Sequence, residues 1–200
     1  MRLKNGALVA GVALWLAATG IGTVWLVDFA SRPGIQAMGP KEIPADTFSD
    51  RDLNFPTLAV FVHPHCSCSR ATLKELARLV SRSEESINVY VLFYRPAGKS
   101  REWVETDLWE LTLKMPNVRE IIVNKKVLTR FGAMTSGHAI LYDRKGSNIF
   151  TGGITNARAH EGDNLGKSVI LSYLANGEIP VQNAPVFGCA LTSEHVSMRN

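Results

Sequence analysis

The chain has 200 residues, with 22 Lys and Arg against 18 Asp and Glu and a formal net charge of +4. The basic residues are scattered without a dense run, which argues against a nucleic-acid-binding surface. Three cysteines are too few for a disulfide-rich scaffold. Because the number is odd, at least one thiol of an exported chain would be free, metal-bound or paired with another chain. This length suits one membrane segment and one domain of ordinary size.

The N-terminal region has the pattern of a membrane anchor. Residues 1–6 contain Arg2 and Lys4, and residues 7–27 contain no charged side chain. About 20 helical residues cross a hydrocarbon core of about 30 Å. The positive residues predict a cytoplasmic N-terminus and a single-pass anchor in the inner (cytoplasmic) membrane, with the domain facing the periplasm or cell exterior. A cleaved signal peptide is the alternative, but its apolar core would usually be only about 7–15 residues long.

The rest of the chain divides into three expected parts. Residues 28–56 contain four prolines and no helical or strand period, which predicts a semi-extended tether. We expect a domain over residues 57–178 and a C-terminal tail over residues 179–200.

The domain shows alternating strand and helix patterns. Short apolar or β-branched runs predict strands, and an apolar stripe at i, i+3, i+4 and i+7 predicts helices. The expected strands are 58–62, 87–94, 138–142 and 148–151, and 118–123 is either a short strand or an irregular connection. The expected helices are 69–81, 101–115, 125–131 and 165–174. Strands joined through helices imply parallel crossovers, and the hairpin around Gly146 adds antiparallel strands. The fold class is therefore an α/β sheet with helices on both faces.

Two cysteines lie in the turn between the first strand and the first domain helix. Cys66 stands at the start of the helix, where the backbone N–H groups and the helix dipole lower a thiol pKa, so it is the better nucleophile. Ser67 and Ser69 are candidate helix caps. Cys68 lies one step into the helix, where residues i and i+2 do not face each other. A Cys66–Cys68 disulfide would therefore be strained and readily reduced.

The same turn is also a candidate metal site. Cys66, Cys68 and His65 offer thiolates and an imidazole, which suit copper(I) or zinc. Cys189 follows the last helix in a turn rich in Pro and Gly. If the tail folds back, Cys189 becomes a resolving thiol or a third metal ligand; otherwise it is a buried, unreactive cysteine.

The segment Val60-Phe-Val-His-Pro-His-Cys-Ser-Cys-Ser-Arg-Ala71 resembles the active-site region of the thioredoxin-like superfamily. Within it, the segment is similar to the membrane-anchored thiol–disulfide group of the ResA and TlpA type, and most similar to RedB-type proteins. That family has Cys-x-x-Cys followed by Arg. Aligning Arg70 places Cys66 at the first cysteine and Ser69 at the second, so the usual resolving cysteine is missing. The resemblance implies a thioredoxin-like fold.

A second segment, Phe131 to Gly146, resembles the part of that family in which a cis-proline precedes a strand and packs against the catalytic cysteine. Gly137 stands at the proline position here. The resemblance places His138 near Cys66, where it could act as a base, stabilise the thiolate or bind metal. A strand-end histidine that is merely hydrogen-bonded is the alternative.

We therefore expect an extracytoplasmic, membrane-anchored protein that exchanges thiols and disulfides with a protein partner through Cys66, with Cys68 or Cys189 resolving. His138 and His65 would tune the pKa, and no cofactor is needed. The main alternative is a copper-binding protein or metallochaperone. A thiol peroxidase is disfavoured because no Thr-x-x-Cys run includes Cys66, and a non-catalytic binding module is also possible.

Overall fold

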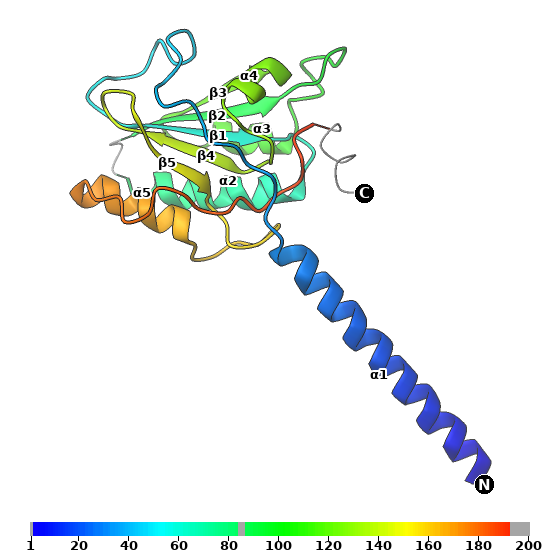
Figure 1. Cartoon of the computed structure of the whole chain (residues 1–200). Helices are drawn as coiled ribbons and strands as arrows, with labels where there is room; N and C mark the ends of the chain where they lie inside the picture. The colour runs from blue at the N-terminus through cyan, green and yellow to red at the C-terminus, as the bar shows by residue number, and fades with distance from the viewer. Residues whose placement is uncertain (1, 84–86, 193–200) are drawn as a thin grey trace. The chain divides into compact units, whose positions relative to one another are not determined.

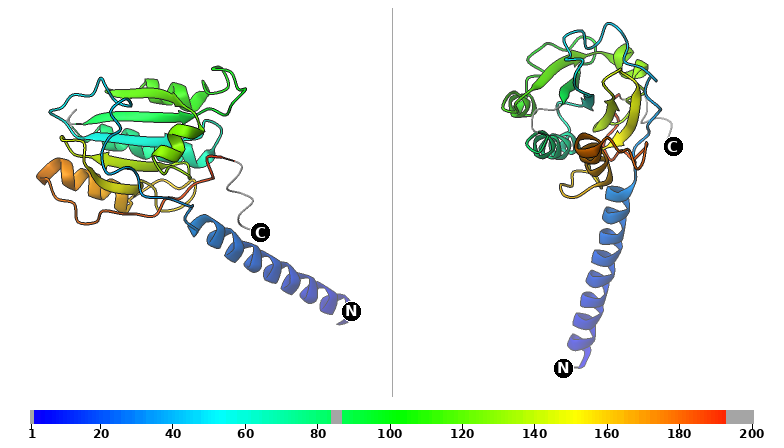
Figure 2. Two further views of the ribbon diagram at one scale, coloured as in Figure 1. Left: turned by 45° about the horizontal axis from the view of Figure 1, so that its top comes forward. Right: turned by 90° about the vertical axis from the view of Figure 1, so that its left-hand side faces the viewer.

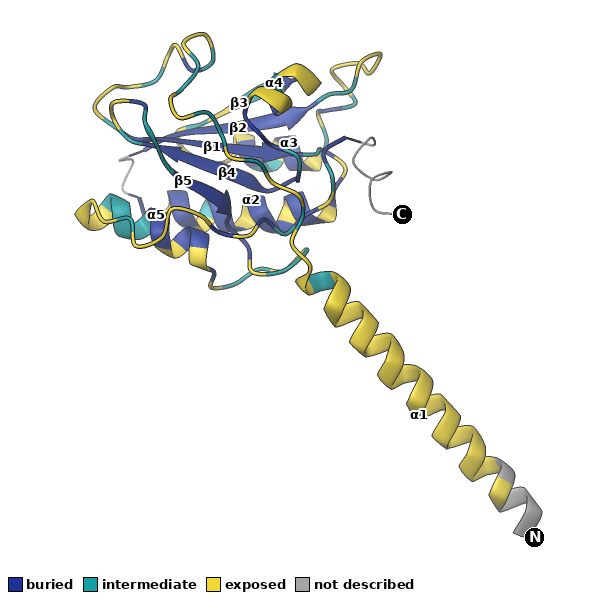
Figure 3. Ribbon diagram, in the orientation of Figure 1, coloured by how far each residue is buried: buried dark blue, intermediate teal, exposed yellow. Residues whose placement is uncertain are grey.

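The computed structural model describes residues 2–83 and 87–192, and the chain separates into one unit over residues 1–32 and another over residues 33–200. The first unit is the helix α1 (Arg2–Ser31). Its segment Leu8–Ser31 has a mean hydropathy of 1.7 and is long and apolar enough to cross a membrane. Figure 3 colours nearly all of the described part of α1 as exposed. The helix extends past both ends of the predicted span 7–27.

The second unit is built on a five-stranded sheet of order β3-β2-β1-β4-β5 (Figures 1 and 2). β1, β2 and β3 run parallel, whereas β4 is antiparallel to both β1 and β5. This confirms the predicted mixed α/β sheet, and residues 118–123 form a strand. The strands are β1 (Thr57–Val62), β2 (Asn88–Tyr94), β3 (Val118–Val123), β4 (His138–Tyr142) and β5 (Asn148–Gly153).

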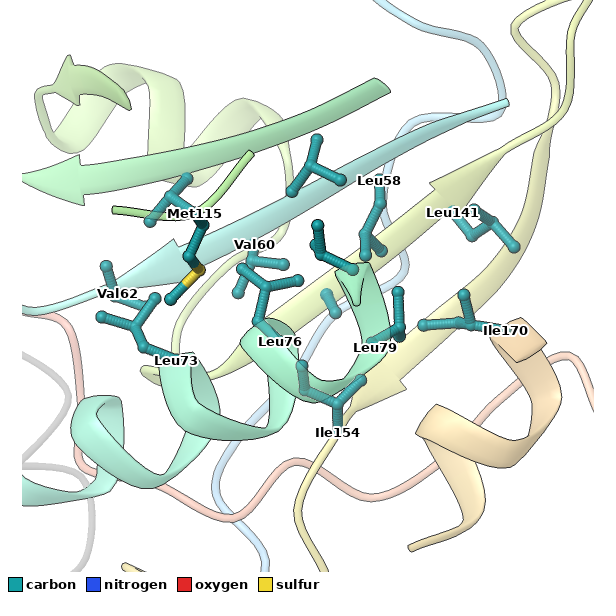
Figure 4. Packing of buried hydrophobic residues seen from close by; sticks show 14 of the residues in the cluster. Leu58, Val60, Val62, Leu73, Leu76, Leu79, Met115, Leu141, Ile154 and Ile170 are labelled. Atoms are coloured by element: carbon teal, nitrogen blue, oxygen red, sulfur yellow. The ribbon is translucent and has the colours of Figure 1, made fainter. Parts of the chain in front are cut away.

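Helices cover both faces of the sheet. Side chains alternate between the two faces along each strand, so Leu58, Val60 and Val62 of β1 join one apolar cluster while Ala59 and Phe61 join the other. The first cluster includes residues of α2 (Ser67–Val80), α3 (Asp107–Leu113) and α5 (Leu165–Asn176), and the second includes a residue of α4 (Lys125–Arg130). Figure 4 shows side chains of β1 and α2 meeting in the first layer: Leu58, Val60, Val62, Leu73, Leu76 and Leu79.

Helix α3 is shorter than the predicted helix 101–115. It begins only at Asp107, because Thr106 adopts an extended conformation and its Oγ1 accepts a hydrogen bond from the N–H of Leu108 at 3.3 Å. The segment from Arg101 to Val104 forms a separate turn. The apolar pattern that predicted one helix is therefore shared between a turn and a helix.

Residues 33–56 are part of the domain, so the expectation of a tether is corrected. The N–H of Gly34 donates to the carbonyl of Val186 at 2.7 Å. Phe48 is buried and stacks on Tyr90 with ring centroids 4.4 Å apart. This segment covers the face of the sheet that α4 leaves open, and burying Phe48 and Tyr90 there favours packing over extension into solvent.

The expected C-terminal tail also packs on the domain. The N–H of Gly153 in β5 donates to the carbonyl of Pro185 at 3.2 Å, and Leu191 is buried in the second apolar cluster. The boundary predicted at residue 179 is therefore not a domain boundary. Residues 193–200 of that tail, including His195, to which the sequence assigned no role, lie outside the described residues.

Candidate functional site

Cys66 marks the point at which β1 passes into α2. The N–H of Cys66 donates to the carbonyl of His63 at 3.3 Å, which closes the turn after the strand. Cys66 is the N-cap of α2, with extended dihedrals of φ −113° and ψ 127°. Cys68 follows in the first helical turn. The predicted capping by Ser67 or Ser69 is wrong, because the N-cap position belongs to Cys66.

Three thiols meet at this turn. The Sγ atoms of Cys66, Cys68 and Cys189 all lie within 4.8 Å of one another. All three are free; Cys66 and Cys68 are buried and Cys189 is exposed. The rule that i and i+2 do not face each other holds inside a helix. It does not separate Cys66 from Cys68, because Cys66 precedes the helix.

The surroundings of the three thiols single out Cys66 as the thiolate. The thiols of Cys189 and Cys68 and the N–H groups of Ser69 and Cys68 donate hydrogen bonds to its sulfur and lower its pKa, although burial acts in the opposite direction. Cys68 donates to the other two sulfurs, and this raises its pKa. The pKa of Cys189 is raised chiefly by its hydrogen bond to Cys66. Cys66 is therefore the strongest acid of the three, as expected at a helix N-terminus.

Backbone pairing holds Cys189 at the site. The N–H of Ser136 donates to the carbonyl of Cys189 at 2.8 Å, and Thr135 forms an antiparallel bridge with Ala190. Gly188 allows this approach, because a Cβ there would overlap the carbonyl oxygen of Ser136. The third cysteine thus reaches the turn through a segment more than 100 positions away in sequence.

Ser69, which the sequence resemblance aligns with a second cysteine, links the turn at Cys66 to the segment before β4 through hydrogen bonds. Its Oγ donates to the carbonyl of His63 at 2.7 Å and lies 2.7 Å from the Oγ of Ser136. The N–H of His63 in turn donates to the Oγ of Ser136 at 3.0 Å. Ser69 and Ser136 are both fully buried. The hydroxyl of Ser69 therefore supports the turn structurally, and nothing in its sequence neighbourhood indicates Ser136 as its partner.

Position 137, where the sequence resemblance expects a proline, requires a glycine. Its φ is +91°, a region that glycine adopts without strain, and no described peptide bond is cis. A Cβ at this position would lie 2.7 Å from the Oγ1 of Thr72. The N–H of Gly137 donates to the carbonyl of Phe61 at 2.8 Å, a hydrogen bond that proline could not make.

His138 is fully buried at the start of β4, beside the ring of Phe61 at a centroid distance of 6.0 Å. Neither ring nitrogen has a hydrogen-bond partner among the described residues, so the expectation of a hydrogen-bonded histidine does not hold there. Burial lowers the pKa of His138 to about 4, so its imidazole is neutral near pH 7. Within the described part of the chain, the cluster of potential metal ligands contains the three cysteines and neither His138 nor His65.

A pocket of about 290 Å³ opens beside Cys66. The Nε2 of His65 lies 2.8 Å from the carbonyl oxygen of Trp103, and its ring is 4.5 Å from the Trp103 ring. Cys66 is only 8% exposed, and it forms part of the wall of this pocket. Its lining consists of Pro64, His65, Cys66, Ser67, Arg70, Thr106, Asp107 and Leu108.

A buried ion pair lies on α2 farther from the turn. The Nζ of Lys167 in α5 lies 2.5 Å from the Oε2 of Glu75, and the N–H of Gly162 donates to Oε1 at 2.9 Å. This pair was not predicted from the sequence. A signal was present: Glu75 falls at i+3 from Thr72 and i−4 from Leu79, on the buried face of its helix.

Comparison with known proteins gives a likeness in structure only. No family model and no curated protein matches the chain. An uncharacterised conserved protein from Geobacillus kaustophilus has a similar structure with a TM-score of 0.59 at 18% identity, over 81% of this chain and 92% of its own. A hypothetical protein from Sinorhizobium meliloti gives 0.56 at 16% identity, over 82% and 95%. An exposed lipoprotein thioredoxin from Streptococcus pneumoniae gives 0.45 at 20% identity, over 70% and 97%.

These likenesses concern the fold. Three parallel strands followed by an antiparallel hairpin, with helices on both faces, form the arrangement that the resemblance implied. The chain has a thioredoxin-like fold, preceded by an apolar helix that could span a membrane. The narrower RedB-type grouping stays a prediction.

Proposed function

We propose that this chain is a membrane-anchored, extracytoplasmic protein that exchanges thiols and disulfides with a protein partner through Cys66. The observation that carries the proposal is the meeting of three free sulfurs within 4.8 Å at the N-terminus of α2. A single buried cysteine would be explained by packing alone. Three thiols from two distant segments, beside a pocket that reaches Cys66, suit exchange chemistry.

In the proposed reaction, the Cys66 thiolate attacks one sulfur of a partner disulfide. A Cys66–partner S–S bond forms, and the second partner sulfur leaves as a thiolate that takes up a proton. A resolving thiolate of this chain then attacks the Sγ of Cys66 and releases the first partner sulfur. The partner disulfide has gained two electrons and two protons, and two cysteines of this chain have become a disulfide. The reverse sequence oxidises a partner dithiol.

Cys189 is the better resolving thiol of the two candidates. Cys68 is buried in the first turn of α2, which shields its thiol from solvent. Cys189 comes from a separate segment and is exposed, so its thiol can also be deprotonated by solvent. We assign no catalytic role to His65 or His138 in resolution; each would act only by tuning the thiols.

The test uses the full-length chain in detergent with a peptide disulfide as substrate. Cys189→Ser should accumulate the mixed disulfide at Cys66, wild type should convert it to an internal disulfide, and Cys66→Ser should form none. Ser67→Ala, an exposed neighbour in the same pocket, is the matched control. The exchange proposal fails if Cys66→Ser reacts with the peptide as fast as the control. Accumulation in Cys68→Ser but not in Cys189→Ser would instead make Cys68 the resolving thiol.

The anchoring part of the proposal is supported by the length and hydropathy of the α1 segment Leu8–Ser31 and by the positive residues Arg2 and Lys4 before that segment. The full chain should stay with membranes after alkaline carbonate extraction. The exposed Cys189 should react in intact cells with a thiol reagent that does not cross the inner membrane. Release of a shortened chain would show a cleaved signal peptide, and labelling only after lysis would place the domain on the cytoplasmic side.

A further inference from the structure

We propose that Cys66, Cys68 and Cys189 together form a three-sulfur binding site for copper(I). This goes beyond thiol exchange, because the same three sulfurs would hold an ion without any partner disulfide. The sequence left either His65 or Cys189 as the third ligand, and among the described residues the three sulfurs are the potential ligands that lie together.

The spacing of the sulfurs fits such a site. At a metal–sulfur distance of about 2.3 Å, three sulfurs arranged trigonally around an ion lie about 4.0 Å apart. The three Sγ atoms here are already within 4.8 Å of one another. Each pair therefore needs to approach by less than about 1 Å, which small χ1 adjustments can supply without moving the backbone.

The ligand chemistry selects a soft ion. Thiolates favour copper(I) over magnesium, calcium or manganese, which prefer oxygen. Zinc in a structural site takes four ligands, whereas the described residues supply three at this position. The Nε2 of His65 is 2.8 Å from the carbonyl oxygen of Trp103, so that imidazole nitrogen is already used. A trigonal copper(I) site therefore matches the donor set better than zinc does.

The surroundings suit a site that carries excess negative charge. Three thiolates and one copper(I) ion have a net charge of −2. The backbone N–H groups of Cys68 and Ser69 hydrogen-bond the sulfur of Cys66, and the charge of Arg158 acts favourably on an anionic Cys189. Cys66 and Cys68 are both buried, which limits access of water and oxidants to the ion.

Binding and exchange would compete for the same thiols. With copper(I) bound, the Cys66 thiolate donates electron density to the ion and becomes a weaker nucleophile. A loaded chain should therefore exchange disulfides and be alkylated at Cys66 much more slowly than the free chain. Copper supply would then decide which activity the site shows.

The experiment uses the full-length chain, reduced and kept without oxygen in detergent, and titrated with copper(I) against a chromogenic competing chelator. We expect one ion per chain, with X-ray absorption showing three sulfur ligands. Cys66→Ser, Cys68→Ser and Cys189→Ser should each weaken binding by more than the 10–100-fold typical of losing an outer-shell partner. Ser67→Ala and His65→Ala should bind like wild type. Far-UV circular dichroism of each variant checks that the fold is kept.

Four outcomes would overturn the assignment. Wild type could bind no more copper(I) than a variant with all three cysteines changed to serine. Cys189→Ser could keep the wild-type affinity, which would reduce the site to the two cysteines of the turn. His65→Ala could lose the ion as fully as Cys189→Ser, which would make the imidazole a ligand. A folded Cys66→Ser chain that fails in disulfide exchange but keeps full copper binding would separate the two proposals and refute this one.

Discussion

Replacing Lys167 by methionine tests the buried ion pair that joins α2 to α5. The side chains of Lys167 and Glu75 are only 6% and 0% exposed, and their Nζ and Oε2 atoms are 2.5 Å apart. Breaking a buried pair by removing one partner costs about 3–5 kcal/mol, because the other charge stays buried. In this variant Glu75 still accepts the hydrogen bond from the Gly162 N–H and pairs with the half-exposed Arg78. We therefore expect the free energy of unfolding to fall by about 3 kcal/mol. In a chain of this size, that loss lowers Tm by about 6–12 °C.

Urea unfolding of the reduced full-length chain, followed by near-UV circular dichroism, measures this loss. Lys74→Met is the matched control, because Lys74 is 48% exposed and pairs with Glu161; it should change stability by less than about 1 kcal/mol. The double variant Glu75→Leu/Lys167→Met leaves no buried charge and should recover most of the loss. Equal stability of Lys167→Met and Lys74→Met would refute a stabilising role for the buried pair.

Three further predictions concern the pH dependence of the Glu75–Lys167 pair, the hydroxyl of Ser69 and the close approach at Gly188. Burial alone would raise the pKa of Glu75, but Lys167 and the Gly162 N–H hold it below 4.5. The pair therefore stabilises the fold fully above the unfolded-state pKa and loses this effect as pH falls through the folded-state value. Wild type should lose stability more steeply than Glu75→Leu/Lys167→Met as the pH falls below 4.5, the ordinary pKa of a glutamate. Equal slopes would contradict this. Ser69→Ala should lower the free energy of unfolding in urea by about 1–3 kcal/mol, because it leaves buried hydrogen-bond partners unsatisfied. The control Ser67→Ala should change it by less than about 0.5 kcal/mol. Equal effects would contradict the structural role of Ser69. Gly188→Ala should displace Cys189 from Ser136 and slow formation of the Cys66–Cys189 disulfide, measured by quenched alkylation and peptide mapping, and an unchanged rate would show that this approach does not position Cys189.

The sequence was sufficient where local pattern and burial agree. The strands of the parallel core are uniformly apolar, because both of their faces are covered, so β1 and β2 were located to within a residue. The amphipathic stripe located α2, and the turn residues located the β4–β5 hairpin. The position of Cys66 at the start of a helix also followed from sequence alone.

Sequence patterns were misleading where backbone pairing is non-local. Residues 33–56 are proline-rich and aperiodic, yet Phe48 and the backbone of Gly34 pack on the sheet. A segment of this kind can be stabilised by edges and apolar surfaces that only the folded chain provides. The helical rule that separates i from i+2 likewise did not apply to Cys66, whose extended dihedrals place it outside α2.

The sequence by itself determined where most of the strands lie, the apolar N-terminal helix and the thiol-bearing turn, because these depend on residues close together in the chain. Only the tertiary structure decided that Cys189 joins Cys66 and Cys68, that Ser69 bonds Ser136, and that Glu75 pairs with Lys167. In each case the partners lie far apart in sequence and meet through packing and backbone hydrogen bonds. The positions of these residues along the chain do not by themselves predict the contacts between them.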